Sequence, residues 1–446
     1  MRSKRMRARG HDWRAWVPLV ALCLGAACGS EHEGAQAPGT EAGGSRPASS
    51  SPSRPAPSEA VGGGWSHSLG GPEDDTATSV AVGRDGDVVT VVSGTPRQDE
   101  DRAPVPGERL AVTLSRYAAD GVVRWAREFP RERLADLRVA AVPGGDGASF
   151  LSGNSFLYPA NFGQGPTDDA FLVRFDADGR AQWQRRVGQK VWAVAADGAG
   201  GAVVAAEEWK GETQDPVLTH LGADGAVRWT RRFSGTEEGT ALRAVGLTPS
   251  GRTVVAGPLV GTLEVDGVRF GAAGRRGFVL LAFDDAGKLA WGREVPGVNG
   301  RVTSLAVGAD GAVVVTGDFT GQLAWGGTEL GTSGPFVLGA GAEGEARWLK
   351  QPACGQMAGP GPSVAVGTAG SVAVTCGDLF SRYAVDGTPR DTRTIPATDC
   401  VSGTCTLATT GVAAEPEGGF VVSGWQRDGK GDAWDQDGFL RFVPPE

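Results

Sequence analysis

Two Asp-x-Asp-Gly segments, residues 176–179 and 435–438, carry an acid spacing found in calcium-binding loops. A calcium loop built around such a glycine needs a carboxylate at its first position and a bidentate glutamate at its twelfth. Around residues 176–179 those positions hold Arg174 and Arg185, and residues 435–438 also lack both carboxylates. We therefore expect both segments to be hairpin turns. The alternative that stays open is a surface cation held by the acidic cluster Asp428, Asp432, Asp435 and Asp437.

Residues for nucleophilic catalysis are scarce in this sequence. A nucleophile needs a base beside it, and the exported part of the chain has histidine only at His32, His67 and His220. We interpret His67 and His220 as strand residues, and no GxSxG, HExxH or P-loop pattern is present. We therefore predict no catalytic residue, no metal and no cofactor. Paired carboxylates for glycoside chemistry stay open, because their pairing in space is invisible in a sequence.

Three tryptophans outside the repeated frame are candidates for ligand binding: Trp209, Trp425 and Trp434. Each falls in or next to a variable loop, and loops commonly carry binding residues. A flat aromatic ring in a loop can stack on a sugar or anchor a protein partner. The alternative is that each ring covers the end of its own structural unit.

A repeated strand pattern must position these side chains, and residues 302–348 show it most clearly. This stretch has four short apolar runs rich in β-branched residues, separated by Gly, Asp-Gly and Glu-Gly. Such a pattern predicts four antiparallel strands joined by tight hairpins. A single unit of this size cannot bury both of its faces, but stacked copies can.

Copies of this unit fill most of the chain. The signal Gly-x-x-x-Trp closes five of them, and the five tryptophans are Trp125, Trp183, Trp229, Trp291 and Trp348. Counted from Trp65, successive tryptophans lie 46 to 62 residues apart. This spacing, with four strands in each unit, indicates the blades of a β-propeller.

The opening hairpin of the unit occurs seven times, for example as SLAVGADGAVVV from Ser304. Asp391 replaces the tryptophan of the sixth unit, and the seventh unit ends before a fourth strand. The missing strand is supplied by residues 65–70 (WSHSLG), which we expect to pair with residues 438–442. This pairing removes the two exposed edges of an open array. The sequence therefore predicts an all-β, seven-bladed β-propeller of four-stranded antiparallel blades, closed by the N-terminal strand.

Two known families resemble these repeats. WSHSLGGPEDDTATSVAVGRDGDVV and DDAFLVRFDADGRAQW resemble the SBBP-type β-propeller repeat of bacterial surface proteins, and the resemblance covers about residues 65–442. It implies the fold and says little about activity. FDDAGKLAW also resembles the tryptophan-docking motif of quinoprotein dehydrogenases and of the propeller lipoprotein in the outer-membrane β-barrel assembly machinery. In those families the tryptophan packs between blades, so this resemblance implies packing and not a quinone cofactor.

The N-terminus is built like an export signal. A basic head is followed by an apolar stretch at 15–24 and by small residues that end at Cys28. The apolar run is too short for a permanent membrane span. Cys28 resembles the acylated cysteine of a bacterial lipobox, and the lack of Asp at Gly29 implies outer-membrane sorting in such proteins. A plain signal peptide, cut at small residues, is the alternative.

These features divide the chain into a signal peptide (1–27), a lipidated Cys28 with a disordered Gly/Pro/Ser tether (28–64), and the propeller (65–446). The whole chain carries a net charge of −9, and residues 1–27 hold six basic groups and Asp12, so the exported chain carries −14. An acidic protein is a poor partner for nucleic acid. We expect it to reach the membrane through the lipid anchor only.

Four cysteines in the last quarter of the chain indicate two disulfides in an exported protein. In a blade whose strands alternate in direction, Cys354 and Cys376 should lie on one face, close enough to bond. Gly403 permits the tight reversal that a Cys400–Cys405 bridge needs. We therefore favour Cys354–Cys376 and Cys400–Cys405. The other connectivities stay open, because all four cysteines can lie on one rim.

Together these features predict a monomeric, lipid-anchored propeller at the outer membrane or cell surface that acts as a non-enzymatic binding or scaffolding module. The expected partner is an envelope protein or a glycan. The alternative is a propeller enzyme, either a lyase or hydrolase of envelope polysaccharide or a quinone-dependent dehydrogenase. A central funnel lined by arginine and aromatic residues, or a cluster of convergent acids, favours the enzyme. A funnel lined by small residues favours the binding module.

Overall fold

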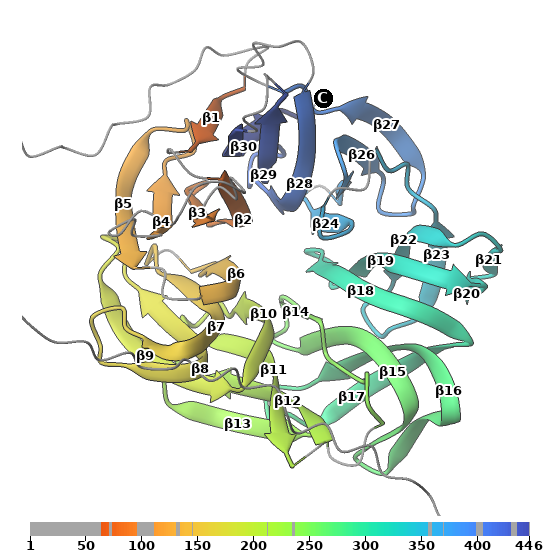
Figure 1. Cartoon of the computed structure of the whole chain (residues 1–446). Coiled ribbons are helices and arrows are strands. Elements are labelled where there is room, and N and C mark those ends of the chain that lie inside the picture. Colours follow the sequence, from red (N-terminus) through yellow and green to blue (C-terminus); the bar gives the residue numbers. More distant parts are fainter. Residues whose placement is uncertain are drawn as a thin grey trace, which may run out of the picture. The chain divides into compact units, whose positions relative to one another are not determined.

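The computed structural model describes residues 64–445, except 71–73, 96–110, 131–133, 145, 212, 234–236, 356–358, 369, 398–404 and 430–434. The described residues form seven four-stranded antiparallel sheets arranged around a common centre, as Figure 1 shows. No helix in this part of the chain is long and apolar enough to cross a membrane. The predicted seven-bladed β-propeller is confirmed.

The first four blades, each given from the channel outward, follow the chain in order. Blade one has β2 (Asp74–Val82), β3 (Val88–Thr95), β4 (Ala111–Tyr117) and β5 (Val123–Pro130). Blade two has β6 (Leu134–Ala141), β7 (Ser149–Ala160), β8 (Thr167–Phe175) and β9 (Ala181–Gly188). Blade three has β10 (Lys190–Ala196), β11 (Ala202–Lys210), β12 (Thr213–Leu221) and β13 (Val227–Arg232). Blade four has β14 (Ala244–Leu247), β15 (Thr253–Val265), β16 (Val268–Phe283) and β17 (Leu289–Pro296).

The remaining three blades complete the ring. Blade five has β18 (Val298–Val307), β19 (Val313–Gly321), β22 (Gly334–Ala340) and β23 (Ala346–Lys350), with an inserted hairpin of β20 (Leu323–Trp325) and β21 (Thr328–Leu330). Blade six has β24 (Ser363–Val366), β25 (Val372–Cys376), β26 (Leu379–Tyr383) and β27 (Pro389–Thr394). Blade seven has β28 (Cys405–Ala414), β29 (Phe420–Asp428), β30 (Asp435–Val443) and β1 (Ser66–Leu69).

The first and last strands share blade seven. In the antiparallel pair of β1 and β30, Ser66 lies opposite Arg441 and Leu69 lies opposite Gly438. The N–H of Phe442 also donates to the carbonyl of Trp65 at 2.9 Å. The ring closure predicted from the sequence is therefore confirmed.

The closing tryptophans pack six of the seven blades against the next one. Five indole N–H groups donate, at 2.7–3.0 Å, to a carbonyl in the acidic-Gly turn of the following blade; the pairs are Trp65–Ala119, Trp125–Ala177, Trp183–Ala223, Trp291–Ala342 and Trp348–Val385. The turn must end in glycine, because a Cβ on Gly344 (φ +76°) would lie 2.6 Å from the ring of Trp291. The packing role implied by the docking motif is confirmed.

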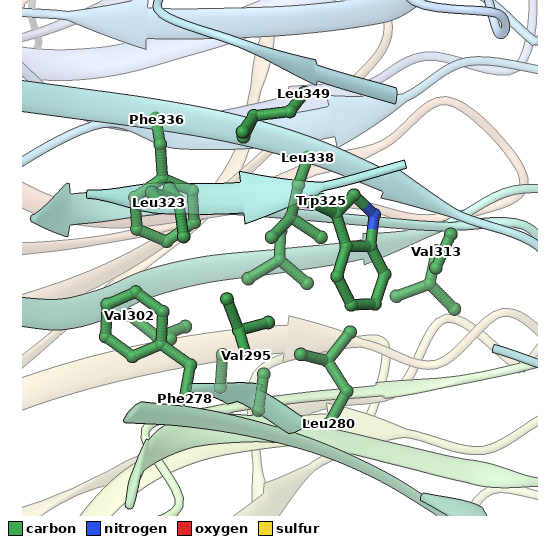
Figure 2. Close-up of a cluster of buried hydrophobic side chains, with 14 of the residues drawn as sticks. Phe278, Leu280, Val295, Val302, Val313, Leu323, Trp325, Phe336, Leu338 and Leu349 are labelled. Carbon is green, nitrogen blue, oxygen red and sulfur yellow. The ribbon is translucent and has the colours of Figure 1, made fainter. Parts of the chain in front are cut away.

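Apolar side chains fill the space between neighbouring blades. Figure 2 shows one such cluster, in which Phe278 and Leu280 of β16 pack with Val302 of β18 and Phe336 of β22. Val302 is 3% exposed. Its burial fixes β18 in the ring, with Arg301 and Thr303 on either side of it lining the centre.

The two Asp-x-Asp-Gly segments have different structures. Residues 176–179 form the predicted turn, in which the amides of Asp178 and Arg180 donate to Oδ1 of Asp176 at 3.0 and 2.8 Å. The prediction is wrong for residues 435–438, which lie in β30, where Asp435 pairs with Asp428. Gly438 lies in a strand because it pairs with Leu69 of β1 and with Trp425 of β29. A glycine is needed there, since a Cβ on Gly438 would lie 2.8 Å from the backbone nitrogen of Ala77.

One disulfide lies fully within the described residues. Cys354 and Cys376 are bonded to each other with a Cα–Cα distance of 4.8 Å, as predicted. Cys405 is also disulfide-bonded. Its predicted partner Cys400 lies outside the described residues, so the Cys400–Cys405 pairing stays a prediction.

Candidate functional site

A cavity lies at the centre of the ring, and we call it the central channel. Its volume is about 680 Å³, and residues from the innermost strands of all seven blades line it. This volume falls within the range of small-molecule binding pockets. The side chains at the wall are therefore the first place to look for function.

Interruptions in the innermost strands direct side chains into this channel. Five of these strands shift register, and the residues skipped are Thr78 in β2, Asp136 and Leu137 in β6, Trp192 in β10, Thr303 in β18 and Thr410 in β28. A β-bulge turns a side chain away from the regular alternation. In blade five, Gly317 permits the close approach, because a Cβ there would lie 2.0 Å from the carbonyl oxygen of Arg301.

In three blades the bulge holds a threonine that bonds to the next blade. The hydroxyl of Thr78 is shared between the carbonyl of Val91 in its own blade at 3.3 Å and the carbonyl of Leu137 in the next blade at 3.5 Å. Those of Thr303 and Thr410 donate to the carbonyls of Pro362 and Ala77. We call Thr78, Thr303 and Thr410 the threonine set. The O–H donors of these hydroxyls are therefore engaged inside the ring.

Blades two to five place a different group of residues at the same wall. We call Arg138, Trp192, Arg243 and Arg301 the cationic arc. Trp192 occupies the bulge of β10, and Arg243 directly precedes β14. The guanidinium carbon of Arg243 lies 3.3 Å from the centre of the Trp192 ring, and Nζ of Lys190 lies 3.9 Å from it. The stacking holds the Arg243 guanidinium in place through a cation–π interaction.

The three arginines differ in how their charges are compensated. Nε of Arg301 lies 2.9 Å from Oδ2 of Asp318. Burial lowers the pKa of Arg138, and the nearby charge of Asp136 opposes that effect. Burial also lowers the pKa of Arg243, where Glu207 and Asp136 raise it and Arg301 lowers it further. Arg243 therefore lies among other charges without a carboxylate bonded to it in the described structure.

Two buried donors at this wall have no hydrogen-bond partner among the described residues: Nε of Arg243 and Nε1 of Trp192. Buried N–H groups are almost always paired in folded proteins, and an unpaired one costs about 1–3 kcal/mol. Both donors belong to the same stacked pair. The residues of this pair line the channel, so an acceptor that enters it meets Arg243 and Trp192 first among groups with unused donors.

Asp136 provides an acceptor beside these donors. Its backbone is left-handed, with φ at +53°, a strained conformation that often marks a functional position. Nδ2 of Asn154 donates to Oδ2 of Asp136 at 2.9 Å, and the amide of Val191 donates to Oδ1 of Asn154 at 2.7 Å. The Asp136 carboxylate is therefore held in a fixed position next to the bulge of Trp192.

Two of the three tryptophans predicted as ligand-binding candidates are described, and they lie in different places. Trp425 lines the channel, with the guanidinium carbon of Arg427 5.5 Å from its ring centre. Trp209 is 54% exposed and does not line the channel. Trp209 lies one residue from the end of β11, next to the turn that follows it, and Trp425 lies within β29, three residues from its end. Trp434 and the proposed lipidation site Cys28 lie outside the described residues.

The two histidines of the propeller serve the fold. Nε2 of His67, on β1, lies 2.7 Å from the carbonyl of Gly121. Nε2 of His220, on β12, lies 2.8 Å from Oδ2 of Asp197. Both are buried strand residues, as predicted. The described residues contain no group of three or more His, Cys, Asp or Glu side chains suited to a metal; Asp432 of the acidic cluster lies outside them.

No protein-family profile and no curated protein matches this chain. Solved structures do match it. The WD40 domain of Pan2 from Neurospora crassa covers 85% of this chain and 98% of its own at 8% identity and a TM-score of 0.44. Hydrazine synthase from Kuenenia stuttgartiensis covers 82% and 96% at 11% identity and a TM-score of 0.44. A protein of unknown function from Bacteroides caccae covers 59% and 81% at 14% identity and a TM-score of 0.37.

The sequence did not lead us to the cationic arc. Its signal becomes visible when the seven opening hairpins are aligned on the bulge, where the residues are Thr78, Leu137, Trp192, Arg243, Thr303, Pro362 and Thr410. Three blades have threonine at this position, whereas Trp192 is the one aromatic residue and Arg243 the one charged residue among the seven. They occupy adjacent blades, so the ring brings them together.

Proposed function

We propose that this protein is an exported, lipid-anchored binding module whose central channel receives an anionic ligand and does not transform it. The observation that carries the proposal is the stacked pair of Arg243 and Trp192, whose buried Nε and Nε1 donors have no partner among the described residues. A guanidinium prefers oxyanions as partners. The arginines of the neighbouring blades add positive potential around that pair in an otherwise acidic protein.

The lining of the channel bears on both functions weighed from the sequence. The cationic arc has the arginine and aromatic lining expected of an enzyme, whereas the opposite wall has the small residues expected of a binding module. General acid–base chemistry needs a suitable proton donor or acceptor within reach of the substrate. Among the described lining residues, Asp136 is the one carboxylate, and histidine, lysine and tyrosine are absent. We therefore place binding first.

A polysaccharide lyase or hydrolase is the second candidate function, and Asp136 is the observation that favours it. A carboxylate with a strained backbone, fixed by Asn154 beside three arginines, could serve as a base. The distinguishing assay is incubation of the protein with acidic polysaccharides, followed by measurement of new reducing ends and of unsaturated products. Turnover that disappears in Asp136→Asn would favour the enzyme over the binding module.

The cellular setting is part of the proposal. The export signal, the lipobox-like Cys28 and the resemblance of the repeats to SBBP-type surface proteins support a place at the outer membrane or cell surface. An envelope glycan is then the partner of suitable chemistry. We expect Cys28→Ser to move the protein from the membrane fraction to the soluble envelope fraction. Unchanged membrane association would contradict the lipid anchor.

A binding screen tests the proposed ligand class. The protein is titrated with carboxylated, sulfated and phosphorylated glycans and with their neutral counterparts at one ionic strength. We expect binding of anionic glycans that is lost in Arg243→Gln. The matched control is Arg269→Gln, which removes an exposed arginine of β16 outside the channel. Equal losses in both variants would show that the effect is one of net charge and not of the channel.

A further inference from the structure

We propose that the group recognised in the channel is a single carboxylate on a hydroxylated frame, as in a uronic acid sugar. This inference rests on the proposed function and names its ligand class. The first argument is the shape of the donor. Arg243 lies at stacking distance from Trp192 and lines the channel. A guanidinium edge presents two parallel N–H groups, which match the two oxygens of a planar carboxylate.

The second argument is charge balance at the cationic arc. Arg301 is paired with Asp318. The charge of Asp136 acts on both Arg138 and Arg243, and Glu207, which lies opposite Lys190 in the register of β10 and β11, also acts on Arg243. Four cations, Arg138, Lys190, Arg243 and Arg301, thus face three carboxylates, Asp136, Glu207 and Asp318, so one positive charge is in excess. One uncompensated positive charge matches one carboxylate and is poorly matched to a dianionic phosphomonoester.

The third argument is the acceptor beside the donors. An ionised carboxylate such as Asp136 accepts hydrogen bonds and cannot donate them. It therefore suits a ligand with hydroxyl groups next to its anionic group, and it repels a ligand with several anionic groups close together. Asn154 fixes its orientation at 2.9 Å. Trp425, elsewhere on the wall of the channel, offers an aromatic surface on which a sugar ring can pack.

Two sources can supply such a group: a uronate unit within an envelope polysaccharide, or a free sugar acid. Isothermal titration of the full-length protein separates them with four probes at one ionic strength: a triuronate, monomeric glucuronate, the carboxyl-reduced trisaccharide and glucose 6-phosphate. We expect both uronates to bind, and the carboxyl-reduced trisaccharide to bind roughly 10- to 150-fold more weakly than the triuronate. A preference for the triuronate over glucuronate assigns the site to a polysaccharide, and equal affinity assigns it to a free sugar acid.

Two variants test the geometry. Arg243→Lys keeps the charge but loses the two-pronged donor, so we expect uronate affinity to fall roughly 10-fold or more. Trp192→Phe keeps a ring under Arg243 but removes Nε1–H, and we expect a loss of roughly 2- to 10-fold. Arg269→Gln serves as the control, and unchanged melting temperatures confirm that each variant is folded.

The outcomes separate the inference from the proposed function. Tighter binding of glucose 6-phosphate than of glucuronate, lost in Arg243→Gln, would overturn the carboxylate while leaving an anion-binding channel intact. Full uronate affinity in Arg243→Lys would also overturn the carboxylate geometry. Failure of every anionic probe to bind would overturn the inference and the proposed function together.

Discussion

The threonine set and the Trp192–Arg243 pair of the cationic arc occupy equivalent positions around one channel, but they use these positions in opposite ways. Thr78, Thr303 and Thr410 point their hydroxyls at carbonyls of the next blade and so hold the ring together. Arg243 and Trp192 pair with each other and leave donors unused. In a fold made of repeats, the backbone supplies the same geometry several times, so a residue that departs from the repeat is free to serve a ligand. Three ways to test this comparison follow, in order of decreasing expected effect.

Removal of the disulfide tests whether destabilising the wall opposite the cationic arc also changes ligand binding at the arc. Cys354–Cys376 closes a loop of sequence separation 22, and this loop includes the channel-lining residues 359–362. We expect Cys354→Ser with Cys376→Ser to lower the free energy of unfolding by about 3 kcal/mol in the chain-entropy model. Urea unfolding measures this loss. Anionic ligand affinity should change by less than about threefold; a loss as large as that in Arg243→Gln would show that the two walls are coupled.

The threonine set is tested most directly at the seam between blades seven and one. Thr410→Val keeps the shape of the side chain and removes the hydrogen bond to the Ala77 carbonyl. We expect a loss of about 1 kcal/mol in the free energy of unfolding and no change in ligand affinity. The control is Thr328→Val, at an exposed position of β21. Loss of ligand binding in Thr410→Val would mean that the threonines belong to the site.

The smallest effect is expected from protonation of His67, beside the same seam. Burial lowers the pKa of His67, and its hydrogen bond to the Gly121 carbonyl partly opposes the shift. The unfolded chain therefore takes up this proton at a higher pH than the folded protein does. The contribution of neutral His67 to the free energy of unfolding is present in full above about pH 6.5. It is lost as the pH falls from there toward the pKa of His67 in the folded protein.

This prediction is checked by urea unfolding at about pH 7.5 and about pH 5.5. We expect the wild type to lose more stability over this interval than His67→Gln does, while ligand binding by the two proteins stays alike. Equal pH dependence of the two proteins would remove His67 as a cause.

The fold could be predicted from the sequence because its signals are local and repeated. Each hairpin turn that ends in glycine and each closing tryptophan marks one blade, and six of these glycines, five of them after an acidic residue, lie against a tryptophan ring. The strand at residues 65–70 was recognised as the missing member of blade seven because the count of strands required it. The turn at residues 435–438 was predicted wrongly, since its Asp-Gly pair lies in β30, where Gly438 pairs with the distant Leu69 of β1 and with Trp425 of β29.

The candidate site could not be predicted in the same way. Arg138, Trp192, Arg243 and Arg301 each look like an ordinary member of a repeat when read singly. They become a site because closure of the ring brings four blades to one channel and because the bulge turns Trp192 inward. Trp425 is a candidate because it lies near a variable loop, but its place at the wall of the channel follows from its position within β29.

The central claim is that the cationic arc serves a ligand and is dispensable for the fold. The most direct test replaces Trp192 and Arg243 with threonine, the residue at the equivalent position of three other blades, in the double variant Trp192→Thr with Arg243→Thr. Binding of a triuronate and the melting temperature are then measured. We predict that affinity falls by roughly 100-fold or more, while the melting temperature stays within about 4 °C of the wild type. A folded double variant that binds the triuronate as tightly as the wild type would contradict the account.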